Sequence, residues 1–60
     1  MQFRVAISVP TRRMTLDAIV DAYDEDGAIE VATEMFLIRF GEYPEDMGEY
    51  IIKVQLEDYN

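Results

Sequence analysis

The side chains that could do chemistry in this chain are mostly carboxylates. Among 60 residues there are thirteen Asp and Glu, five Lys and Arg, and neither His nor Cys. Thiolate and imidazole chemistry is therefore absent, including the commonest general base and the usual zinc ligands. Ser8 is the single serine, and no acid lies within two residues of it. Paired carboxylates need a concave site, for which so small a domain has little room. We predict that the chain is not an enzyme.

The acidic segment 24–27 (Asp-Glu-Asp-Gly) is the strongest candidate for a metal site, because calcium loops place carboxylates around a sharp glycine turn. The spacing does not fit, since Ala22, Ala28 and Ile29 occupy positions where ligands are required. The same acids suit the N-cap and first turn of a helix. The later acids at 42, 45, 46 and 49 are typical of a solvated loop. We predict no metal and no cofactor.

Charge is unevenly distributed along the chain. Residues 1–13 hold Arg4, Arg12 and Arg13 and no acid, so the remainder carries thirteen acids against Arg39 and Lys53, a net charge of −11. The overall charge of −8 disfavours general attraction to nucleic acid phosphates and to anionic lipid. No stretch approaches the roughly 20 apolar residues of a membrane span. We expect a cytoplasmic protein that binds neither nucleic acid nor membrane.

Direct nucleic-acid binding has one argument in its favour. The basic residues Arg4, Arg12, Arg13 and Lys53 could contact phosphates while Tyr23 and Tyr59 stack bases on an open sheet face. Acids at 17, 21 and 57 fall on the same face, and cross-strand charge pairing explains the pattern more simply.

Alternation of apolar and polar residues predicts three strands. Residues 2–9 alternate strictly, and Pro10 then ends the pairing at a hairpin turn. Residues 14–23 fit both periods, and we assign a strand because the helix cap at Asp24 follows it directly. Residues 49–59 alternate again. A right-handed crossover places this third strand beside the first.

A helix is predicted over residues 25–40, ended by Gly41 and kept from resuming by Pro44. Its apolar arc spans about 200°, roughly twice an ordinary surface stripe. A three-stranded sheet cannot cover so wide an arc, so part of the helix is expected to meet another chain. The expected interface residues are Val31, Met35, Leu37 and Ile38.

The sequence thus predicts one α+β domain over residues 1–60, with a ββαβ order and a mostly antiparallel three-stranded sheet that packs one face on the helix. A core of this size is near the lower limit of independent folding. Without disulfides or metals, oligomerisation is the remaining source of stability, and we expect a homodimer.

The leading functional prediction is a non-catalytic protein-binding module with a basic partner. Its acidic surface could occupy and block a nucleic-acid-binding groove on that partner. The expected contact residues are Glu30, Glu34, Glu42, Glu45, Asp46 and Glu49. One alternative is a structural or assembly protein that acts through the apolar helix face. Another is a small metal or ligand binder.

Two likenesses accompany this prediction. Residues 22–32 resemble the strand-to-helix junction of many unrelated small α+β domains, which identifies no family. The compact, acidic, cysteine-free composition is similar in style to small bacteriophage proteins that disable host machinery, including some anti-CRISPR proteins. The second likeness implies an inhibitor that acts by binding protein.

Overall fold

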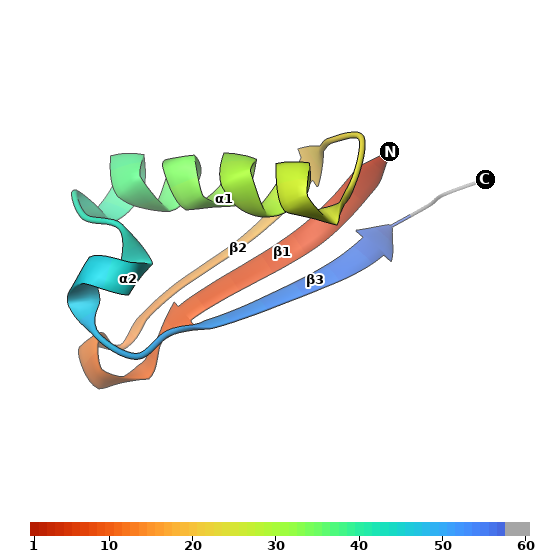
Figure 1. Cartoon of the computed structure of the whole chain (residues 1–60). Coiled ribbons are helices and arrows are strands. Elements are labelled where there is room, and N and C mark those ends of the chain that lie inside the picture. The colour runs from red at the N-terminus through yellow and green to blue at the C-terminus, as the bar shows by residue number, and fades with distance from the viewer. Residues whose placement is uncertain (58–60) are drawn as a thin grey trace.

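The computed structural model describes residues 1–57, which fold into a three-stranded sheet with a long helix on one face (Figure 1). The elements are β1 (Gln2–Val9), the 3-10 turn η1 (Pro10–Arg12), β2 (Met14–Asp21), α1 (Glu25–Phe40), α2 (Pro44–Met47) and β3 (Ile51–Glu57). The sheet order is β2-β1-β3, and both strand pairs are antiparallel. The predicted ββαβ fold is confirmed, with the third strand beside the first.

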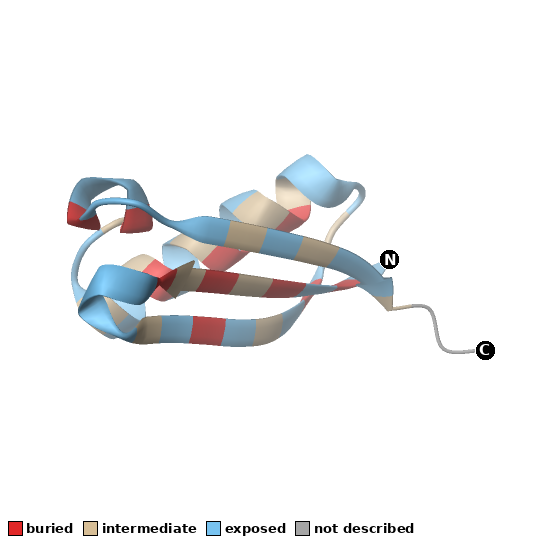
Figure 2. Cartoon of the chain, turned by 90° about the horizontal axis from the view of Figure 1, so that it is seen from below, coloured by how far each residue is buried: buried red, intermediate tan, exposed pale blue. Residues whose placement is uncertain are grey.

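The central strand β1 supplies the middle of the core. Its odd-numbered residues from Phe3 to Val9 are all buried beneath α1, as the alternating colours of β1 show in Figure 2. On the helix, Ala28, Ala32 and Phe36 face them and are fully buried. Leu16 and Val20 from β2 and Met47 from α2 complete the buried apolar set. Among the described residues no polar or charged side chain is buried.

Both ends of α1 are capped as the sequence predicts. The Asp24 side chain accepts a hydrogen bond of 2.8 Å from the backbone N–H of Gly27, which satisfies one of the free donors of the first turn. Gly41 has φ of 83°, and its N–H donates to the Leu37 carbonyl at 2.7 Å. A side chain at this left-handed position would be strained, so glycine ends the helix.

The prediction is wrong about the segment after α1 and about where two strands end or begin. The segment 42–48 is not only a loop, because it contains the short helix α2. Pro44 does not simply prevent a helix; it occupies the first turn of α2, where its missing N–H costs nothing. β2 ends at Asp21 rather than Tyr23, and β3 begins at Ile51 rather than Glu49.

The helix covers the sheet incompletely. In β3 the helix-facing residues Ile52 and Val54 are half-buried, and Leu56 is 50% exposed. On the flank of α1, Val31 and Met35 are 42% and 38% exposed, and Ile38 is 84% exposed. The apolar arc that the sequence predicts to be too wide for the sheet is therefore partly open to water.

No helix in the described part of the chain is long and apolar enough to cross a bilayer.

Candidate functional site

A groove runs along the exposed flank of α1, and we call it the α1 groove. It has a volume of about 790 Å³ and runs from the end of β2 along the helix as far as Ile38. Its apolar lining includes Met1, Tyr23, Val31, Met35 and Ile38, and its acidic lining includes Asp24, Glu30 and Glu34, with Asp21 at the end of β2. It is an open groove and not an enclosed cavity.

The groove exists because β2 carries small side chains where it passes under the helix flank. Ala18 and Ala22 face the helix side and are half-buried, and neither reaches far enough to cover Val31 or Met35. Within residues 1–57 the sheet ends at β2, so no further strand lies beside it on this side. The exposed apolar residues of α1 therefore face an open groove.

The four acids of the groove all remain in contact with water. Asp21 has a side chain 78% exposed, and one of its oxygens lies 3.5 Å from the amino group of Met1. Asp24 is the helix cap, which ties its carboxylate to the backbone. Glu30 and Glu34 lie one turn apart on α1 and are exposed. The result is an apolar strip with negative charge beside it and at its end.

Glu34 is held in place by an aromatic residue from the loop after the helix. The Tyr43 hydroxyl donates a hydrogen bond of 3.0 Å to Glu34 Oε1. This bond and the negative charge of Glu34 raise the pKa of the Tyr43 phenol above its ordinary value of 10.0, and Glu45 and Asp46 add to the effect. The contact connects the α1 groove to the loop that leads into α2.

This contact predicts how mutation changes the alkaline titration of the tyrosine phenols. A raised folded-state pKa means that the interaction stabilises the fold below about pH 10 and is lost as pH rises through the folded pKa. We expect Tyr43→Phe to remove the most alkaline part of the phenolate absorbance titration. Glu34→Gln should shift that part to lower pH. A titration curve that keeps the same alkaline limb in Tyr43→Phe would contradict the contact.

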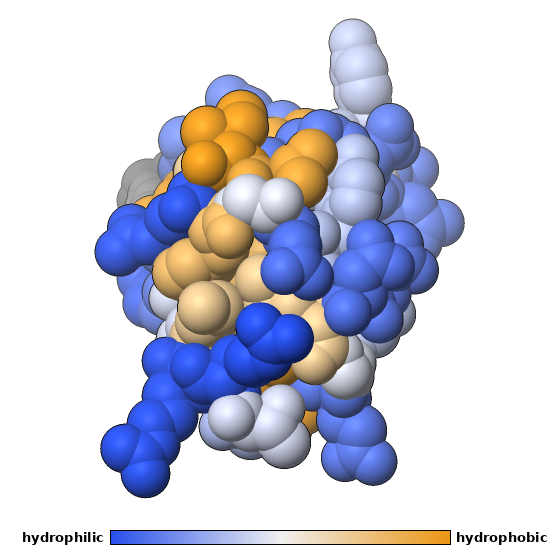
Figure 3. Space-filling view, turned by 90° about the vertical axis from the view of Figure 1, so that its left-hand side faces the viewer, coloured by the Kyte–Doolittle hydropathy of each residue, from blue (hydrophilic) through white to orange (hydrophobic). Residues whose placement is uncertain are grey.

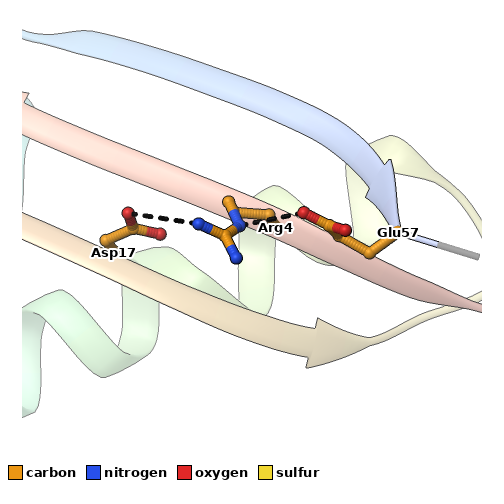
Figure 4. A network of polar contacts seen from close by, with 3 residues as sticks. All are labelled: Arg4, Asp17 and Glu57. Carbon is orange, nitrogen blue, oxygen red and sulfur yellow. Dashed lines mark hydrogen bonds and ion pairs between the residues drawn. The ribbon is translucent and has the colours of Figure 1, made fainter. Parts of the chain in front are cut away.

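The open face of the sheet carries paired charges. Arg4 Nε lies 2.9 Å from Glu57 Oε1, and Arg4 Nη1 lies 4.0 Å from Asp17 Oδ2, so the guanidinium sits between carboxylates of both neighbouring strands (Figure 4). The cross-strand charge pairing predicted for this face is therefore present. Tyr23 is 95% exposed but lies beyond β2 and lines the α1 groove, contrary to the sheet-face position considered from the sequence. Tyr59 lies outside the described residues.

The second group of predicted contact acids lies at the other end of the molecule. Glu42, Glu45, Asp46 and Glu49 are exposed on and around α2, close to the β1–β2 turn (Figure 1). Glu49 borders a smaller hollow of about 430 Å³ together with Pro10, Tyr50 and Ile51. Viewed onto this end, hydrophobic side chains gather at the top, over α1, and strongly hydrophilic ones lie below (Figure 3). Within residues 1–57, no three acids are arranged to hold a metal ion.

The structure thus divides the predicted site residues into two groups. Glu30 and Glu34 come together with Val31, Met35 and Ile38 in the α1 groove, while the four acids around α2 lie apart from them. Leu37 is half-buried and does not line the groove. Met1, Asp21 and Tyr23 also line the groove, and none of them is among the predicted contact or interface residues. The sequence feature that could have indicated the groove is the pair of small residues Ala18 and Ala22, because small side chains leave the neighbouring helix flank uncovered.

Comparisons of the chain with protein-family models, with curated proteins and with solved structures found no match.

Proposed function

We propose that this chain is a non-catalytic protein-binding module whose acidic surface engages a basic surface on a partner protein. The observation that supports the proposal is the α1 groove, where apolar side chains and carboxylates share one exposed surface. Ile38, 84% exposed, is a large apolar side chain that the fold itself does not use. Exposed apolar strips bordered by charge are typical of interaction sites.

The two kinds of side chain have different roles in the proposed complex. Burial of Val31, Met35 and Ile38 against the partner provides affinity, because it removes apolar area from water. Glu30 and Glu34 accelerate association with a positively charged surface and disfavour other partners. A partner face of about 800 Å² is standard for a stable complex. On a chain with a total surface of 4336 Å², a face of this size extends well beyond the groove itself.

A more specific form of the proposal makes the partner a nucleic-acid-binding protein. The net charge of −8 on a 7.0 kDa body resembles the charge density that a basic nucleic-acid groove accepts. The module then acts as a cytoplasmic inhibitor that competes with nucleic acid for that groove. Competition with a nucleic-acid oligomer for the captured partner separates this form from binding elsewhere on the partner.

The second candidate is an assembly role through the apolar residues alone, including a homodimer. Val31, Met35 and Ile38 are exposed enough to support it, and so are Tyr50, Ile51 and Leu56 near β3. Groove-to-groove pairing of two copies is less favourable than binding a basic partner, because it brings Glu30 and Glu34 of both copies together. Self-association through the β3 side avoids this repulsion.

Capture from a lysate at two salt concentrations tests the proposal. We expect a tagged chain to retain a basic protein from nuclease-treated lysate at about 50 mM salt and to release it at about 500 mM, where the screening length is roughly threefold shorter. Salt-resistant capture, or recovery of the chain alone, contradicts the acidic-surface proposal. That result favours the assembly role, which sedimentation velocity of the free chain then tests.

A further inference from the structure

The outer edge of β2 is an open strand edge without Lys, Pro or a bulge. Within residues 1–57, β2 is paired only on its β1 side, so one side of its backbone is open. Its eight residues include no Pro, Gly or Lys, and its pairing with β1 runs without interruption from Met14 to Asp21. Natural edge strands are commonly blocked by charged side chains, by Pro or by a bulge, and of these β2 carries only the carboxylates of Asp17 and Asp21. The other edge strand, β3, has Lys53 near its centre.

The open edge lies next to the α1 groove. Asp21, at the end of β2, and Ala22 line that groove together with Val31, Met35 and Ile38 of α1. A strand added to this edge would lie about 4.8 Å beyond β2, on the side of the sheet where the α1 groove opens. Alternate side chains of the added strand would point toward that flank. The exposed apolar residues of α1 would then gain the cover that the three-stranded sheet does not give them.

The other face of the same edge is acidic. Asp17 and Asp21 lie on the open face of β2 with side chains 56% and 78% exposed, and Ile19 between them is 49% exposed. Opposite charges on neighbouring strands stabilise a sheet. An added strand would therefore favour Lys or Arg on this face. The pairing of Asp17 with Arg4, at 4.0 Å, and of Asp21 with the Met1 amino group, at 3.5 Å, leaves both carboxylates largely in water.

We infer that the outer edge of β2 is a docking site for an extended segment of the basic partner, which adds to the sheet as a fourth strand. The segment alternates apolar residues, which enter the α1 groove, with Lys or Arg, which face Asp17 and Asp21. Main-chain hydrogen bonds supply affinity and the alternating side chains supply specificity, as in other complexes formed by strand addition. This inference rests on the proposed function and specifies its partner.

The charges favour this occupant over two others. A second copy paired edge to edge through β2 would bring the Asp17 and Asp21 carboxylates of both copies together, which destabilises a sheet. A helix laid on Val31, Met35 and Ile38 would leave the backbone of β2 unpaired and would not reach the open face, where Asp17 lies. Only an extended basic segment uses the edge, the groove and the acidic face together.

The test uses a short capped peptide in which Lys alternates with Val, and amide hydrogen exchange of the intact chain. We expect the peptide to slow exchange at alternate residues of β2 and to shift the methyl signals of Val31 and Ile38. A peptide in which Glu replaces Lys should have no effect. Methyl shifts without protection of β2, protection of β3 instead, or protection of β2 by self-association without peptide would each overturn the inference.

Two charge-matched double variants locate the interaction. Asp17→Asn/Asp21→Asn should weaken peptide binding by about two- to thirty-fold, the range for two cross-strand charge pairs. Glu45→Gln/Asp46→Asn removes the same charge at α2 and should leave binding within about twofold. Equal weakening by both variants overturns the site.

The capture experiment and the exchange experiment together separate the two proposals. Salt-sensitive capture of a partner without protection of β2 rejects the strand site but keeps the proposed function. Failure of both experiments rejects both proposals.

Discussion

Replacement of Phe36 by alanine should remove most of the free energy of unfolding of the domain. Phe36 is the largest fully buried side chain, and its ring lies 4.6 Å from that of Phe40 between centroids. Removal of a buried aromatic ring costs about 3–5 kcal/mol of the free energy of unfolding. A domain of this length is expected to have only about 3–9 kcal/mol in total. One substitution therefore removes most of the stability.

Circular dichroism with urea titration measures this effect. Phe36→Leu keeps most of the volume and should cost about 1.5 kcal/mol or less. Ile38→Ala, at an exposed position on the same helix, should change the free energy of unfolding by about 0.5 kcal/mol or less. A cooperative transition of Phe36→Ala within about 1 kcal/mol of the parent chain would show that the core does not depend on this ring.

Reversal of both helix acids of the α1 groove should abolish partner binding. Glu30→Lys/Glu34→Lys replaces two carboxylates by cations that face a basic partner, and a like-charge contact at an interface costs several kcal/mol. We expect affinity for the captured partner to fall on the order of 100-fold or more. Both residues are exposed, so the circular dichroism spectrum and the urea midpoint should stay close to those of the parent chain.

Glu45→Lys/Asp46→Lys is the control for this reversal. It changes the net charge equally, but at α2, whose residues do not line the groove. We expect slower association at low salt and only a small loss of affinity near physiological salt, because screening limits the reach of exposed charges. If both double reversals abolish binding equally, the whole acidic surface acts without a localised site. If neither does, the carboxylates serve solubility alone.

Local signals made most of the fold predictable. The strict alternation of β1 predicts its bounds, since a half-buried strand needs one apolar face. The bounds of α1 follow from Asp24 and Gly41, whose side-chain acceptor and left-handed backbone mark the two ends. The helix α2 was not predicted because Pro44 ends some helices and begins others, and the difference depends on tertiary contacts: Pro44 and Met47 are both buried.

The groove was only partly predictable. The width of the apolar arc of α1 indicates that Val31, Met35 and Ile38 exceed what the sheet covers. The side on which they emerge depends on helix placement, and so does the inclusion of Tyr23 and Met1. Separation along the chain does not predict which residues line the groove. Glu42 is closer in sequence to Glu34 than Asp21, Tyr23 and Asp24 are, yet Glu42 does not line the groove. The turn at Gly41 nevertheless carries the acids around α2 away from the groove.

The position of β3 has a consequence for the order in which the domain folds and for where it unfolds locally. Among the described residues its one strand partner is β1, the first strand, so this pair closes a long loop, whereas β1 and β2 form a local hairpin. No residue of β3 is fully buried. The hairpin and α1 can therefore assemble during synthesis before β3 is available, and β3 docks last. In the finished protein β3 is the element whose detachment disrupts the least core, so local unfolding begins there and leaves β1 with an open edge of its own.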